Sequence, residues 1–191
     1  QSLTDAFRNA FSTTPWLLRY PDTDLGTDYG MHDDSLTYST LGKTSWYFWP
    51  SVEREGMTTT WKEHPMGGEI RPENQKNLFK ASFGDDSNEQ PLNDCTDTVH
   101  LSWALNAYAF DPGYTGIEEE RAKKGAARMG YGYHLETLVY DWLPPNQTTL
   151  KLSATICNRG VAPSYYPLTA SIFSPSTNTT HDRISLHPLL P

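Results

Sequence analysis

Short apolar runs and amphipathic stretches alternate along the first 130 residues. Residues 16–21, 29–36 and 65–69 are short, mainly apolar runs with charged side chains toward their ends. This pattern is typical of buried strands that lead into loops. Residues 97–110 predict a further strand, although the pattern toward their C-terminal end also fits a helix. Amphipathic stretches at 2–11, 72–83 and 115–131 predict helices between them. This repeated order of strand, loop and helix indicates a parallel α/β sheet.

Two of the predicted helices carry recognisable signals at their ends. Ser2 is placed as the N-cap of the first helix. Thr115 and Glu118 have the spacing of a capping box at the start of the helix 115–131. Within that helix, Glu119 with Lys123 and Glu120 with Lys124 are favourable pairs four residues apart.

The pattern changes near residue 131. Leu150, Leu152, Ala154 and Ile156 alternate with polar residues, the period of a strand with one buried face. The C-terminal part, with a boundary between residues 131 and 145, therefore predicts an antiparallel segment of a β-sandwich.

Composition and charge exclude some classes of partner. The chain has 191 residues, 37% of them apolar, which suits a soluble globular protein. A formal net charge of −8 disfavours nucleic acid and anionic membranes, which attract clustered Lys and Arg. No apolar run approaches the roughly 20 residues of a transmembrane helix. There is also no charged-then-apolar leader, so we expect any secretion signal to have been removed or to lie outside this sequence.

Cysteines and glycosylation motifs bear on the compartment. The two cysteines, Cys95 and Cys157, permit one disulfide that would tie the two parts together, but they do not require it. Asn146 and Asn178 each begin an N-glycosylation motif. Together with the acidic charge, these motifs favour an extracellular, secreted glycoprotein with N-glycans at both asparagines.

Polar side chains gather where the predicted strands end. Glu69 follows two glycines, and we expect it at the C-terminal end of a parallel strand, where Arg71 could keep its carboxylate ionised. Asp33 and Asp34 end the strand before it; they could contact a ligand, act as acid/base, or cap a helix. Arg19 ends a buried strand and should therefore meet a carboxylate. The remaining candidates for ligand binding are His32, His100, Trp103 and Asn106.

Each of these residues also has a purely structural interpretation. Glu69 would then pair with an arginine across the sheet, and Trp103 would pack in the core rather than serve as a stacking platform. A metal site is not expected, because no HxH, HExxH or CxxC spacing occurs. No phosphate-binding glycine loop or GxSxG motif is present, so no cofactor is expected either.

Six short motifs in one order carry a resemblance to a known family. They are LLRYP, MHDDS, MGGEIRPE, HLSWALN, RMGYGYHLE and NRGVAPSYY, and they span roughly residues 14–173. The series resembles an uncharacterised family, known only as a domain of unknown function. Its members are similar to glycoside hydrolases in having a (β/α) barrel followed by a β-sandwich. A full barrel needs about 250 residues. The resemblance therefore implies that residues 1–130 are the C-terminal half of a (β/α)8 TIM-type barrel and that residues 131–191 begin the sandwich.

The resemblance also implies a function. Glu69 would stand where related enzymes place their nucleophile, with Asp33 and Asp34 as candidate acid/base groups or sugar contacts. The acid/base partner would come from a strand upstream of Gln1, so we expect this chain alone to be inactive. Its partners would be a carbohydrate and either the upstream half of the barrel or another copy covering the sheet edges. The alternative is a non-catalytic extracellular structural protein, such as a subunit of a filament or sheath.

Overall fold

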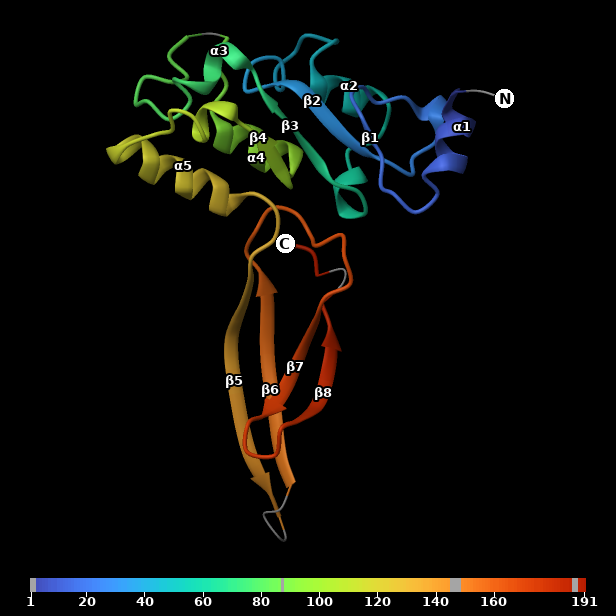
Figure 1. The fold of residues 1–191 in the computed structure, drawn as a ribbon, viewed down its shortest axis with the longest axis vertical. Coiled ribbons are helices and arrows are strands. Elements are labelled where there is room, and N and C mark those ends of the chain that lie inside the picture. The colour runs from blue at the N-terminus through green and yellow to red at the C-terminus, as the bar shows by residue number, and fades with distance from the viewer. Residues whose placement is uncertain (1–2, 87, 145–148, 187–188) are drawn as a thin grey trace.

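The computed structural model describes residues 3–86, 88–144, 149–186 and 189–191. Figure 1 shows an α/β part, formed by the first two thirds of the chain, from which two long β-hairpins project. The helices are α1 (Leu3–Ala10), α2 (Phe48–Arg54), α3 (Pro72–Gln75), α4 (Leu92–Val99) and α5 (Gly116–Arg128), with 3-10 turns η1 (Thr23–Leu25), η2 (Thr60–Lys62) and η3 (Ala107–Ala109). The strands are β1 (Leu17–Leu18), β2 (Gly30–Leu36), β3 (Met66–Ile70), β4 (Trp103–Leu105), β5 (Tyr133–Leu143), β6 (Thr149–Asn158), β7 (Thr169–Ser174) and β8 (Thr179–Ser185).

The α/β part contains a sheet of four parallel strands in the order β1-β2-β3-β4. Each strand lies beside the next one along the chain. The connection from β1 to β2 contains only η1, whereas α2 lies between β2 and β3, and α3 and α4 lie between β3 and β4. The predicted α/β class with parallel strands is confirmed.

One face of this sheet is covered by α2 and α4. Met31 and Met66 point from the central strands into this layer and are fully buried. Val52 of α2 and Val99 of α4 pack against them and are also fully buried. This apolar cluster is the core of the molecule, and it fixes which side of each strand faces inward.

Three predicted features of the α/β part differ in the structure. The predicted strand at 97–110 is wrong in its first part, because Val99 is the last residue of α4 and only Trp103–Leu105 is a strand. The predicted helix at 72–83 is limited to α3, which has four residues. Thr115 stands at the N-cap of α5, but its side chain makes no capping hydrogen bond. The predicted N-cap Ser2 lies outside the described residues.

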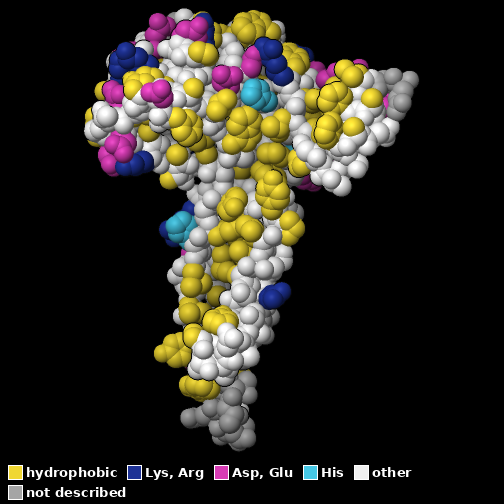
Figure 2. Space-filling view, in the orientation of Figure 1, with side chains coloured by type: hydrophobic (Ala, Val, Ile, Leu, Met, Phe, Trp, Pro, Cys, Tyr) yellow, Lys and Arg dark blue, Asp and Glu magenta, His cyan; other side chains and the backbone are white. Residues whose placement is uncertain are grey.

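The two hairpins are antiparallel, as predicted for the C-terminal part. β5 pairs with β6 and β7 pairs with β8, and the two pairs form separate two-stranded sheets. The apolar residues of β5 and β6 share one face, because Tyr140 lies opposite Leu152 and Trp142 lies opposite Leu150. Tyr140 is 66% exposed and Trp142 is 55% exposed, so this apolar face is largely open. Figure 2 shows it as a hydrophobic stripe along the projecting hairpins.

The hairpins join the α/β part through the segment that follows β6. Asn158 accepts hydrogen bonds from the backbone N–H of Gly132 and Gly160, at 2.9 and 3.0 Å, and donates to the carbonyl of Ala162 at 2.9 Å. The hydroxyl of Tyr165 donates to the carbonyl of Trp61 at 2.7 Å. The motif NRGVAPSYY is therefore a structural junction between the two regions.

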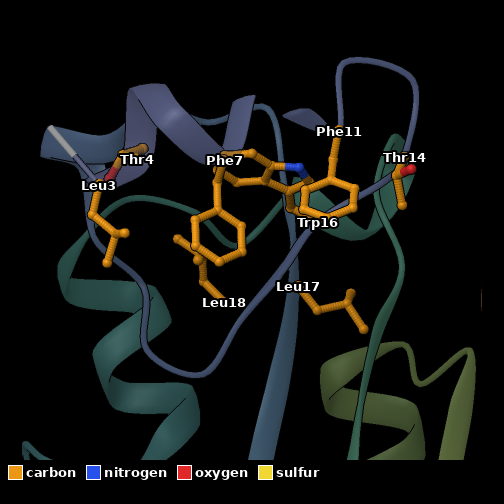
Figure 3. A pocket seen from close by; sticks show the side chains of 8 residues that line it. All are labelled: Leu3, Thr4, Phe7, Phe11, Thr14, Trp16, Leu17 and Leu18. Atoms are coloured by element: carbon orange, nitrogen blue, oxygen red, sulfur yellow. The ribbon is translucent and has the colours of Figure 1, made fainter. Parts of the chain in front are cut away.

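Helix α1 packs beside β1 at the edge of the sheet. The rings of Phe7 and Trp16 make an edge-to-face contact with centroids 6.2 Å apart. Figure 3 shows that these rings line an apolar pocket, together with Leu3, Phe11, Leu17 and Leu18. Phe7 and Phe11 remain about half exposed. No helix among the described residues has the length and apolar character needed to cross a bilayer.

Candidate functional site

The sheet face opposite α2 and α4 carries polar and aromatic side chains at the strand ends. Since Met31 and Met66 point into the core, alternation places their neighbours His32 and Gly67 on the other face. The parallel register sets Gly67 between His32 on β2 and Trp103 on β4. We call this surface the open face; it comprises Leu17, Arg19, His32, Asp34, Gly67, Glu69, Trp103 and Leu105.

Glu69 is the last residue but one of β3, at the C-terminal end of a parallel strand, as predicted. Its side chain is half-buried and lies beside Leu105 of β4. Within the part of the chain that the structure describes, the Glu69 carboxylate makes no hydrogen bond or ion pair. It is therefore available to a ligand or to another segment of protein.

Asp34 lies on the open face and forms an ion pair with Arg19. The prediction that Arg19 meets a carboxylate is confirmed, although its side chain is 75% exposed rather than buried. An exposed pair of this kind adds little stability. The pair instead holds Asp34 in place beside the strand end that carries Glu69.

Asp33 is not part of the open face, so it does not lie beside Glu69 as expected for a candidate acid/base group, and that role stays a prediction. Its side chain is 3% exposed and points into the layer beneath the sheet. Its carboxylate accepts hydrogen bonds from the Thr40 hydroxyl at 2.6 Å and from the backbone N–H of Ser35 at 2.9 Å. Burial raises the pKa of the Asp33 carboxyl, and these two hydrogen bonds only partly oppose the rise. Asp33 therefore anchors the loop that follows β2.

Trp103 lies flat against the backbone of Gly67. A Cβ atom placed on Gly67 would come within 2.3 to 2.5 Å of three indole atoms, so only glycine leaves room for this arrangement. The imidazole of His32 approaches the indole from β2, with ring centroids 5.3 Å apart. Trp103 is half-buried. Because one side of the indole rests on the sheet, its other side can receive a second flat apolar surface.

Arg71 does not pair with Glu69, contrary to the prediction. Its guanidinium lies over the ring of Tyr38, 3.6 Å from the centroid, and its Nε donates to Glu73 at 2.9 Å. The proline after Arg71 begins α3, and this turn carries the arginine away from the open face. Glu69 is consequently left without the cationic neighbour that the sequence suggested.

His100 and Asn106 make contacts within the fold, and their role as binding residues stays a prediction. The His100 ring stacks on Trp61 with centroids 3.6 Å apart, and its Nδ1 lies 2.6 Å from the carbonyl of Val161. Asn106 caps the turn η3 through the backbone N–H of Ala109 and donates to the hydroxyl of Tyr114 at 2.9 Å. Both side chains are already occupied within the fold.

The cysteines are free, so the disulfide that the sequence permits between Cys95 and Cys157 is not formed. Cys95 lies in the core on α4, and burial raises the pKa of its thiol to about 12. Cys157 lies on β6, outside this core, opposite His134. Asn178 is exposed in the turn between β7 and β8, where an N-glycan has room, whereas Asn146 lies outside the described residues.

Sequence reasoning missed Leu17 and Leu105 on the open face. Arg19 and Trp103 on the same segments were predicted as site residues. Alternation within WLLR and WALN would have placed Leu17 and Leu105 on the same face as these two residues. Sequence reasoning also missed Tyr38 as a partner of Arg71, since no local pattern relates residues on separate loops.

Comparison with known proteins returned no matching family model, no matching curated protein and no matching solved structure. Among the described residues, no group of three or more His, Cys, Asp and Glu side chains is arranged to hold a metal ion.

Proposed function

We propose that this chain is a carbohydrate-directed part of a secreted protein and that a sugar lies on the open face. The observation that carries the proposal is the free, half-buried carboxylate of Glu69 two residues beyond the glycine that supports the Trp103 indole. Sugar recognition uses this combination, because a pyranose offers an apolar C–H face to a ring and hydroxyls to a carboxylate.

The open face supports the interpretation of the α/β part as the second half of a (β/α)8 barrel. In such barrels the helices cover the outer side of the strands, and sites lie at the C-terminal strand ends on the inner side. Here α2 and α4 cover one side only, and Glu69 and Asp34 lie at strand ends on the other. Strands β1 and β4 are sheet edges, and further barrel strands would cover them.

Hydrolysis of a glycosidic bond would need a second carboxyl group. Retaining glycosidases hold their two carboxyl groups about 5 Å apart and inverting enzymes hold them about 6.5–9.5 Å apart. Asp34 is engaged by Arg19, and Asp33 faces the core, so neither is free for this role. We propose that the acid/base group comes from the missing strands and that Glu69 is the nucleophile. With those strands present, Glu69→Gln should reduce turnover by orders of magnitude and preserve binding.

A second function, that of a non-catalytic extracellular assembly protein, is favoured by one observation. The apolar face of β5 and β6 is exposed, and another sheet or another copy of the chain would bury it. In the sugar-directed proposal, the same face belongs to a β-sandwich whose other strands complete it. The exposed Asn178 suits the secretory route that both functions share.

The proposal is tested by binding of neutral oligosaccharides to the chain and to Trp103→Ala. Loss of the stacking platform should weaken binding about fivefold or more, since aromatic contacts contribute about 1 kcal/mol beyond buried area. Trp142→Ala is the matched control, because it removes an equally large indole from a hairpin, away from the open face.

Binding that is lost in Trp103→Ala and kept in Trp142→Ala supports the open face as the sugar site. Equal binding by all three proteins contradicts it. If no neutral oligosaccharide binds and Trp142→Ala abolishes self-association of the parent chain, the assembly function is the better account.

A further inference from the structure

A groove of about 700 Å³ lies between α4, α5 and the loop that follows α3. Leu78, Phe79, Phe83 and Leu92 give it an apolar lining. We call it the basic groove, after the five cationic residues that also line it: Lys80, Arg121, Lys124, Arg128 and Arg159. No acidic residue is among the described residues of this lining.

The charge of the groove is opposite to that of the whole chain, whose formal net charge is −8. Two of the five cationic side chains form ion pairs with acidic residues that lie outside the lining of the groove. Arg128 pairs with both oxygens of Asp97, at 2.5 and 2.7 Å, and Arg159 pairs with Glu136 at 3.2 Å. Local clusters of one sign concentrate counter-ions in a hollow surface.

The other three cations make no ion pair within the described part of the chain. Arg121 donates to the carbonyl of Phe79 at 3.0 Å, which holds its guanidinium at the wall of the groove. Lys80 and Lys124 line the same groove from the loop and from α5. These side chains are therefore positioned for an anionic ligand without having to leave an acidic neighbour.

Helix α5 separates its charges between two faces. Lys123 pairs with Glu119 at 2.8 Å and lies 3.9 Å from Glu120. The pair between Glu120 and Lys124 that the sequence predicted is not formed, because Lys124 turns to the groove. Arg121, Lys124 and Arg128 follow at helical spacing, so they share one face.

We propose that the basic groove binds an anionic glycan. Its sulfate or carboxylate groups would meet Lys80, Arg121 and Lys124, and ring C–H faces would lie on Phe79 and Phe83. The choice of a glycan over an acidic peptide rests on the proposed function. The groove itself is separate from the open face, since α4 packs on the opposite side of the sheet.

The test compares binding of dextran sulfate, unmodified dextran of equal length and poly-L-glutamate to the same chain. We expect dextran sulfate to bind most tightly and to weaken as salt screens the contacts. The double variant Arg121→Gln/Lys124→Gln should lose about tenfold or more in affinity for dextran sulfate. The single variant Lys124→Gln should also weaken binding of dextran sulfate, whereas Lys123→Gln, which removes the same single charge one residue away beside Glu119, should bind like the parent.

Equal weakening by Lys123→Gln and by Lys124→Gln overturns the proposal, because net charge alone would then explain binding. Poly-L-glutamate binding as tightly as dextran sulfate overturns the choice of a glycan, as does absence of dextran sulfate binding. None of these outcomes involves Trp103, so failure of the groove is distinguished from failure of the neutral-sugar site on the open face.

Discussion

The α/β part and the hairpins use the same apolar residue types with opposite results. In the α/β part, Leu36, Val52 and Val99 are fully buried between the sheet and its helices. On β5, Leu135 and Leu138 remain 58% and 56% exposed, although the strand pattern is equally apolar. Two-stranded hairpins are marginal alone, whereas a sheet covered by helices has a core. An apolar pattern therefore specifies a face, and only a neighbouring layer turns that face into a core.

The largest expected difference between the two regions is the cost of removing a leucine side chain. Leu36→Ala should destabilise the α/β part by about 2–5 kcal/mol, because it leaves a cavity in a fully buried site. Leu138→Ala should cost less than about 1 kcal/mol, because its side chain is already half in solvent. Urea unfolding of both variants measures the contrast. A cost as large for Leu138→Ala would show that another layer of protein covers the hairpin.

The next effect concerns the two sides of the parallel sheet. Gly67→Ala should destabilise by about 1–3 kcal/mol, because the added Cβ overlaps the Trp103 indole. In a Trp103→Ala background, most of that cost should disappear, since the open side of the sheet has room. A double-mutant cycle by urea unfolding measures this coupling. If the costs of the two substitutions are additive, glycine is required at position 67 by the backbone and not by the contact with the Trp103 indole.

A pH-dependent effect should distinguish buried Asp33 from the groups on the open face. Burial raises its pKa in the folded protein, so the folded chain keeps a proton that the unfolded chain has released. The stability that Asp33 contributes is therefore present below its ordinary pKa of 3.8 and is lost as the pH rises through the raised value. Asp33→Asn should remove this decline. Urea unfolding from about pH 4 to about pH 7 measures it. A parent that gains stability over the variant across this range would contradict the assignment.

The smallest expected effect is that of Glu69→Gln on folding. Since the Glu69 carboxylate has no partner among the described residues, the free energy of unfolding should change by less than about 0.5 kcal/mol. Thermal unfolding of the parent and the variant measures this. A large loss of stability would show that Glu69 supports the sheet and would weaken its role as a group kept free for a ligand.

Helix α4 shows how a short apolar segment can mislead. Val99, His100 and Leu101 precede Trp103 without a break, so the stretch was predicted as strand. Leu92, Cys95 and Val99, however, recur at helical spacing, and all three are buried on one face of α4. His100 ends the helix in the left-handed conformation, with φ 57°, which is uncommon for residues other than glycine. The helical spacing was present in the sequence, but the abrupt end was set by packing.

The sequence by itself determined the order of the four parallel strands, the change to antiparallel strands near residue 131, and the position of Glu69 at a strand end. These properties follow from apolar periodicity and from turn residues, which act over a few positions. Only the tertiary structure decided that Asp33 is buried while Asp34 is open, that Arg71 pairs with Glu73, and that the cysteines stay apart. The physical reason is that alternation defines two faces of a strand, but α2 and α4 determine which face is covered.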